Sequence, residues 1–253
     1  LTARRITLGS GEDEIEAMFD RGWSDGLPLV PPTEERVLRM LQGTVRDPQS
    51  VVGLVPSDLA PATVEKIAIN AVMAGCKPEY LPVVLAAVEA VLEVAVRDAR
   101  RARDHDVCRA RAGGERPGPP AYRHERQGQT ALGQGNRANA TIGRALQLVI
   151  RNIGGGRPQE VDRATLGNPG KYTYCFAEDE EDSSWEPLAV ERGVAPGKSA
   201  VTVFAGYGLQ GVVDQKSRDP ESLARSFAES LKVLQNVKIA PGADAMIVVL
   251  SRA

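Results

Sequence analysis

The residues best suited to binding chemistry form one short stretch, from Gly133 to Arg144. A glycine-rich turn is followed by polar side chains and then by an apolar helical stripe. A helix that starts here leaves backbone N–H groups without partners, and such groups bind anions and polar oxygens. We expect Asn139 or Thr141 to cap this helix. The expected ligand contacts are Gly135, Asn136, Arg137, Asn139, Thr141 and Arg144. The alternative is a well-capped structural helix without a ligand.

Two carboxylates near each other in the sequence could act as an acid or a base. Glu178 follows an alternating, strand-like segment, and Glu186 lies between Trp185 and Pro187. A carboxyl group packed against an aromatic ring can have a raised pKa that suits acid catalysis. We therefore expect Glu178 and Glu186 to be partly buried and catalytic. The alternative is that the acidic run 178–182 is a solvated face.

A cysteine could supply a nucleophile. Cys76 stands beside Lys77 at an expected helix start, where the helix dipole and the ammonium group would lower the pKa of the thiol. The alternative is a buried packing residue, the usual role of a free cysteine. Cys175, between two aromatic residues, is expected to pack in the core. The sequence does not show whether Cys76 and Cys175 are close.

Further candidates are weaker. Asp25 lies in a Trp-Ser-Asp-Gly turn that forms either a lid or a packing corner, and we add Asp25 to the expected substrate contacts. Residues 206–211 match Gly-x-Gly-x-x-Gly, but the next helix signal comes only at Asp219, whereas a dinucleotide site needs a helix at the third glycine. A glycine-rich loop that lines a pocket is the alternative. Acidic residues 178–182 could hold Mg²⁺ or Ca²⁺, yet we assign no metal ligand, and the cofactor remains unknown.

The elements that must position these residues follow from caps and periodicity. Helix caps are expected at 10–13, at Thr33 and at Thr63, with Gly75 ending the third helix. Residues 80–92 are apolar nearly all round, which is typical of a core helix or a subunit interface. Strands are expected at 50–55, 171–176, 199–204 and 245–250, the last two joined by a helix as in a parallel crossover. The fold class predicted is α/β, a mixed or parallel sheet flanked by helices, with a helical N-terminal part.

Composition limits the class of protein. The 253 residues are 42% hydrophobic and 25% charged, with a formal charge of −2. This balance gives no general reason to expect nucleic-acid or bilayer binding. No apolar run approaches the roughly 20 residues that a membrane helix needs, and we expect a cytoplasmic protein. The three cysteines do not make a disulfide framework. With only two histidines, histidine-based zinc sites and Ser-His-Asp triads are not expected.

One segment, 95–130, differs from the rest. Nine arginines occur between Arg97 and Arg126 among many Ala, Gly and Pro residues, and hydrophobic periodicity disappears. One interpretation is a disordered basic linker or an RNA-binding arm. The other is a GC-rich gene translated one base out of frame, because the codons one base later permit an apolar strand and an Asn-Gly-Pro turn. An intact mass that matches the printed sequence would exclude the frameshift.

Four strings together resemble a known family. They are Gly22–Thr33, Asn70–Tyr80, Gly135–Arg144 and Gly170–Glu181. The chain resembles the largely uncharacterised bacterial family associated with UGSC-type (seleno)proteins, which carry a Sec/Cys-Gly-Ser-Cys motif. The resemblance covers most of the chain outside 95–129, but the Sec/Cys-Gly-Ser-Cys motif itself is absent. It implies a bacterial, cytosolic and redox-linked protein and supplies no substrate.

These observations lead to three functional hypotheses. The first is an enzyme domain, of oxidoreductase or lyase type, that binds a small polar or anionic substrate at the glycine-rich helix start. The second is a non-catalytic subunit or binding module for a Cys/Sec-containing redox partner, with homo-oligomers expected. The third, a nucleic-acid-binding protein, depends only on 97–126 and is not favoured. The expected organisation is a helical part at 1–94, the anomalous segment at 95–130 and an α/β part at 131–253, forming one compact unit.

Overall fold

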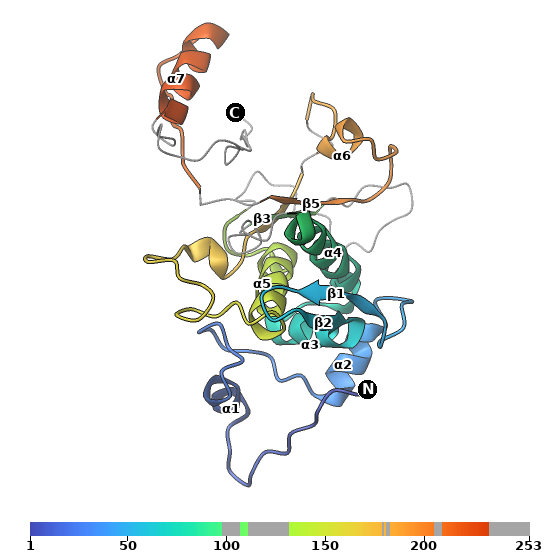
Figure 1. Ribbon diagram of the computed structural model, residues 1–253. Helices are drawn as coiled ribbons and strands as arrows, with labels where there is room; N and C mark the ends of the chain where they lie inside the picture. Colours follow the sequence, from blue (N-terminus) through green and yellow to red (C-terminus); the bar gives the residue numbers. More distant parts are fainter. Residues whose placement is uncertain (98–106, 111–131, 179, 181–182, 205–208, 233–253) are drawn as a thin grey trace. The chain divides into compact units, whose positions relative to one another are not determined.

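The N-terminal helices begin where short polar side chains can cap them. The computed structural model describes residues 1–97, 107–110, 132–178, 180, 183–204 and 209–232 (Figure 1). Helix α1 spans Glu14–Asp20, and the Asp13 carboxylate accepts hydrogen bonds from its first-turn N–H groups. Helix α2 spans Glu34–Leu41 and is capped by Thr33, as predicted. Local side chains thus fix both helix starts.

A hairpin leads into the first long core helix. Strand β1 (Val51–Val55) pairs antiparallel with β2 (Ala60–Thr63). Thr63 caps helix α3 (Val64–Ala74), and Gly75 ends that helix in the left-handed conformation, with φ of 89°. Both ends of α3 agree with the sequence, because each is set by one residue with a strong conformational preference.

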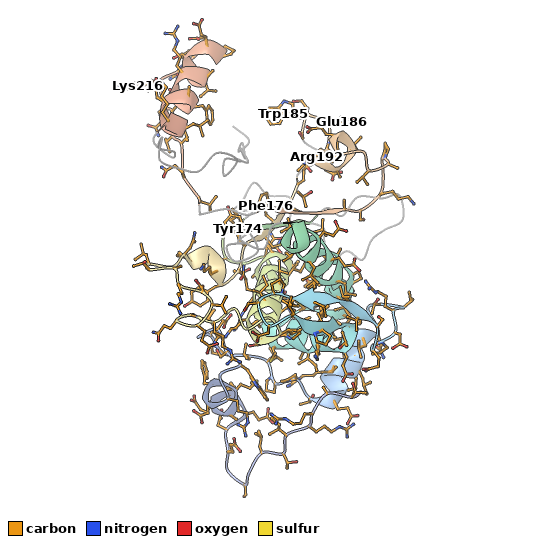
Figure 2. The ribbon with its side chains drawn as sticks, viewed as in Figure 1. Tyr174, Phe176, Trp185, Glu186, Arg192 and Lys216 are labelled. Carbon is orange, nitrogen blue, oxygen red and sulfur yellow. The ribbon has the colours of Figure 1, made fainter. Side chains whose placement is uncertain are left out.

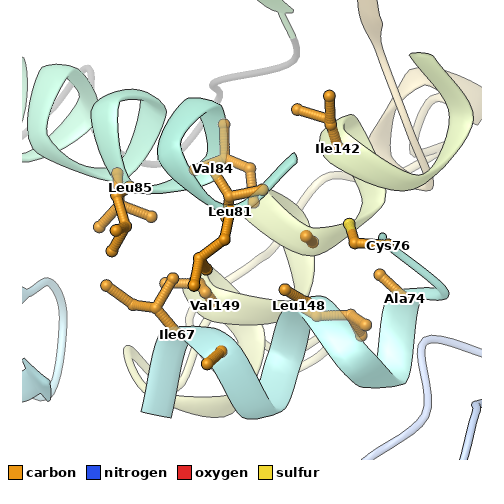
Figure 3. Close-up of a cluster of buried hydrophobic side chains, with 14 of the residues drawn as sticks. Ile67, Ala74, Cys76, Leu81, Val84, Leu85, Ile142, Leu148 and Val149 are labelled. Atoms are coloured by element: carbon orange, nitrogen blue, oxygen red, sulfur yellow. The ribbon is translucent and has the colours of Figure 1, made fainter. Parts of the chain in front are cut away.

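Three helices contribute most of the hydrophobic core (Figure 3). A 3₁₀ turn, η1 (Pro78–Tyr80), leads into α4 (Leu81–Arg97), and α5 (Arg137–Asn152) packs closely against α3 and also contacts α4. The apolar surface expected at 80–92 is buried inside this chain, so its placement in the core is confirmed. The most completely buried large apolar side chains are Val55, Val64, Ile67, Leu81, Val84, Val88, Ile142, Leu148 and Val149.

The second sheet has three strands in the order β4-β3-β5. Strand β3 (Val107–Ala110) pairs parallel with β4 (Cys175–Ala177) and antiparallel with β5 (Val201–Phe204). The strand expected at 171–176 starts late, because Asn168 caps a 3₁₀ turn, η4 (Pro169–Lys171), in front of it. The chain therefore mixes helices with two small sheets.

The chain divides into two units, residues 1–206 and 207–253. In the first unit, α3 and α5 come from opposite sides of the anomalous segment and pack together. A short helix, α6 (Leu188–Glu191), follows β4. In the second unit, α7 (Pro220–Lys232) begins where the Asp219 signal predicts. The strand expected at 245–250 and most of 95–130 lie outside the described residues, so the frameshift stays a prediction.

No helix among the described residues is both long enough and apolar enough to cross a membrane.

Candidate functional site

The helix start singled out by the sequence is the N-terminus of α5. Its cap is Asn136, whose side-chain oxygen accepts a hydrogen bond from the Asn139 N–H at 3.0 Å. Gly135, with φ of 108°, turns the chain into this cap. The prediction that Asn139 or Thr141 caps the helix is wrong, because the Asn136 side chain already reaches the open N–H group. Asn139 and Thr141 therefore lie inside the first two turns of α5.

The polar residues of this helix start bind other parts of the protein. The Arg137 guanidinium donates two hydrogen bonds, at 3.0 and 2.9 Å, to the Gly75 carbonyl at the end of α3. The Asn139 residue is buried, and the Thr141 hydroxyl donates to the Arg137 carbonyl at 2.8 Å. Arg137 thus joins the start of α5 to the end of α3. Substrate contact by Asn136, Arg137, Asn139 and Thr141 stays a prediction.

Two expected substrate contacts, Asp25 and Arg144, are bound to each other. Nε and Nη2 of Arg144 donate to the two carboxylate oxygens of Asp25, each at 2.8 Å. Nη2 also donates to the carbonyls of Leu27 and Pro28, each at 3.0 Å. Only 14% of the Arg144 side chain and 10% of the Asp25 side chain are exposed. Of the two interpretations of the Asp25 turn, the packing corner is the one that these contacts support.

The Cys76 thiol is buried and protonated. It follows the C-cap of α3 and does not begin a helix, and its Sγ donates to the Thr141 carbonyl at 3.3 Å. Burial raises the pKa of Cys76 to about 12, which the Thr141 contact and the positive charge of Arg137 only partly offset. The expectation of a lowered thiol pKa is therefore wrong, because desolvation disfavours the charged form, and a catalytic role for Cys76 stays a prediction.

Cys76 and Cys175 are close enough to interact electrostatically. Ionisation of Cys175 would further raise the pKa of Cys76, and both thiols are free and buried. Cys175 packs in the same hydrophobic cluster, as predicted, and Figure 3 shows Cys76 beside α5. The pair therefore belongs to the core that holds α3, α5 and β4 together.

The two candidate carboxylates differ in their surroundings. Glu178 is partly buried directly after β4, and its carboxylate accepts the Leu188 N–H at the start of α6, at 3.2 and 3.3 Å. Glu186 is exposed beside Trp185, whose residue is 65% exposed (Figure 2). The expected burial is thus confirmed for Glu178 and wrong for Glu186, because the neighbouring Trp185 is itself largely exposed and does not cover it.

Sequence reasoning missed the contacts that fix α5 against the segment before β4. The Thr173 hydroxyl donates to the Ala140 carbonyl at 2.7 Å. A Cβ added at Gly143 would lie 2.6 Å from Thr173 Oγ1 and 2.7 Å from the Tyr174 nitrogen. Glycine inside a helix was the available signal for such a close approach. These contacts hold the N-terminal half of α5 against the segment that leads into β4.

Within the described residues, no group of three His, Cys, Asp or Glu side chains is arranged to hold a metal ion. Comparison of the chain with family models, with curated proteins and with solved structures found no match.

Proposed function

We propose that this chain is an enzyme domain that binds a small polar or anionic substrate at the N-terminus of α5. One observation carries the proposal: Gly135 and Arg137 at this helix start are exposed, and no acidic residue occupies its first turn. Around Gly135, no described atom beyond the chain neighbours lies within 4 Å of the position that a Cβ would take. A ligand can therefore approach the backbone closely.

The electrostatics of this helix start favour an anion. The Asn136 side chain accepts the Asn139 N–H, and helix geometry leaves the N–H groups of Arg137 and Ala138 without an intrahelical acceptor. These groups stand at the positive end of a 16-residue helix. The Arg137 guanidinium, held by the Gly75 carbonyl, adds a full positive charge beside them.

The chemistry would come from Glu178, since the Cys76 thiol is protonated and buried. Glu178 is partly buried, and its carboxylate accepts a hydrogen bond from a backbone N–H, as expected for a positioned acid or base. The family resemblance directs the reaction class toward oxidoreductase or lyase chemistry. The same proposal includes an α/β fold in which residues 245–250 form a further strand, a homo-oligomer and a cytoplasmic location. Cofactor and substrate stay open.

A non-catalytic subunit for a Cys/Sec-containing partner is the second candidate. Helix α4 gives it no support, because its apolar surface is buried in this chain. The observation in its favour is the exposure of Val51, Leu54 and Leu59, each more than half exposed on the β1–β2 hairpin. This candidate predicts that a redox partner contacts the hairpin and that Glu178 is dispensable.

The test is a titration of the ¹⁵N-labelled full chain with acetate and with inorganic phosphate. We expect the amide signals of Arg137 and Ala138 to shift at constant ionic strength. The decisive variant is Asn136→Asp, which keeps a good N-cap acceptor but adds a competing negative charge. It should keep the stability of the chain and lose the shifts. Unchanged shifts in Asn136→Asp would contradict the proposal, as would wild-type amides that do not respond to either anion.

A further inference from the structure

Two arginines lie together at the other end of α5. Arg151 belongs to its last turn, and Arg157 follows the three glycines after the helix. The Gly156 N–H donates to the Ile150 carbonyl at 3.2 Å, so the chain folds back onto that turn. Arg151 directly follows Ile150, and Arg157 directly follows Gly156, so this hydrogen bond brings the two arginines near each other. Figure 1 shows the loop beside α5.

Among the described residues, neither guanidinium has an acceptor for its Nε–H group. The Nε atoms of Arg151 and Arg157 are buried and have no hydrogen-bond partner. In the described part of the chain, neither side chain forms an ion pair. Buried N–H donors without acceptors destabilise a fold, and charged ones do so most. Both residues are only partly buried, so part of each residue is open to solvent.

The two charges also oppose each other. Burial lowers the pKa of Arg151, the positive charge of Arg157 lowers it further, and Asp25 and Glu160 only partly offset this. The Asp25 carboxylate is already bound in two hydrogen bonds by Arg144. A second nearby carboxylate, Asp162, is bound by Lys171 at 2.8 Å. Glu160 acts on Arg151 electrostatically, and the Asp58 carboxylate lies against Gly155, but among the described residues no carboxylate forms an ion pair with Arg151 or Arg157.

The backbone that carries Arg157 is fixed. Its carbonyl accepts the N–H groups of Glu160 and Asp162, at 3.2 and 3.1 Å. On the other side, the Gly154 carbonyl accepts the Ser57 and Asp58 N–H groups, at 2.8 and 3.2 Å. A pair of cations on such a rigid frame is preorganised for a ligand and does not need to fold around it.

We propose that Arg151 and Arg157 form a binding site for the phosphate group of a small ligand. Each guanidinium presents a planar fork of donors, and a phosphate supplies up to two negative charges and several acceptor oxygens. The phosphate would neutralise both arginines, which lack an ion-pair partner among the described residues. This site is distinct from the start of α5, since 14 residues of helix separate Arg137 from Arg151, about 20 Å.

The test uses the full chain and inorganic phosphate, with sodium chloride added to keep the ionic strength constant. Phosphate should raise the melting temperature and shift the Nε–H NMR signals of both arginines. In Arg151→Gln and in Arg157→Gln the affinity should fall at least about tenfold, as expected for a lost charge-assisted hydrogen bond. The matched control is Arg163→Gln, which removes an exposed arginine from the same loop and should leave affinity unchanged.

Three further measurements test the proposed phosphate site. Arg157→Lys keeps the charge but not the fork, so weakened binding in this milder variant supports the site even if a glutamine variant does not fold. Glycerol phosphate in a parallel titration distinguishes the source of the phosphate group. Tighter binding of glycerol phosphate than of inorganic phosphate indicates an organic phosphate, whereas inorganic phosphate that binds at least as tightly indicates the free ion. Equal affinity in Arg157→Gln and Arg163→Gln would overturn the proposal. Acetate that binds as strongly as phosphate would overturn the ligand class.

Discussion

Asp25 and Arg144, 119 residues apart, form a two-pronged ion pair that fastens the N-terminal loop to the middle of α5. The guanidinium also holds the carbonyls of Leu27 and Pro28, so one side chain fixes the whole turn. Because this turn lies against the helix that carries both proposed binding sites, the pair determines how rigidly those sites are framed.

Removal of either partner of this pair should destabilise the fold. Asp25→Ala leaves a largely buried guanidinium without its carboxylate, and we expect a loss of about 3 kcal/mol in the free energy of unfolding. Arg144→Lys should also be destabilising, because lysine cannot form the two-pronged contact. The control is Arg39→Ala, which breaks an exposed pair with Glu35 and should cost less than about 0.5 kcal/mol. Urea denaturation measures the free energy of unfolding of each variant. Equal losses in Asp25→Ala and Arg39→Ala would contradict a structural role for the Asp25–Arg144 pair.

At acid pH, the free energy of unfolding should depend on whether the Glu65 carboxyl group is ionised. Burial alone would raise the pKa of Glu65, but hydrogen bonds from the Thr2 and Ala3 N–H groups and from Gln49 outweigh it and lower the pKa to about 2. The carboxylate therefore contributes fully above its unfolded value near 4.5, and the contribution disappears as pH falls toward 2.

The measurement is the free energy of unfolding between pH 2 and pH 6. The wild-type chain should lose on the order of 2 kcal/mol more than Glu65→Gln across this range. Glu35→Gln, which removes an exposed carboxylate, is the matched control and should follow the wild type. A Glu65→Gln curve parallel to that of the wild type would show that the hydrogen bonds do not favour the charged form.

The Cys76 thiol should be unreactive in the folded protein. With a pKa of about 12, almost none of it is thiolate at pH 8, and burial blocks access by a reagent. Iodoacetamide followed by mass spectrometry should label Cys76 only after denaturation. Cys76→Ala should change stability and leave anion binding at α5 intact. Rapid alkylation of the native chain at pH 8 would restore the nucleophile hypothesis.

Gly143→Ala should be destabilising, although alanine is the better helix former by about 1 kcal/mol. The new methyl group would lie 2.6 Å from Thr173 Oγ1 and 2.7 Å from the Tyr174 nitrogen. Forcing α5 away from this segment should cost about 2 kcal/mol and lower the melting temperature. Ala140→Gly, at an exposed position of the same helix, should cost only the propensity difference. A Gly143→Ala chain that is as stable as the wild type would show that the helix can shift freely.

Much of the local structure was predictable from the sequence. Thr33 and Thr63 cap their helices, Gly75 ends α3, and the apolar helix after Tyr80 is buried, all as expected. Each of these features depends on residues within about four positions of one another or on a repeated apolar pattern. Such short-range preferences act before the chain has any tertiary structure.

Only the tertiary structure decided what the candidate site residues do. Asp25 and Arg144 bind each other, and the buried Cys76 thiol donates to the Thr141 carbonyl. Arg137 donates to the Gly75 carbonyl at the end of α3, 62 residues away in the sequence. A charged or polar side chain has the same appearance in a sequence whether it meets a ligand or another part of the protein. Which of these it meets depends on how α3, α4 and α5 pack, and no local pattern encodes that packing.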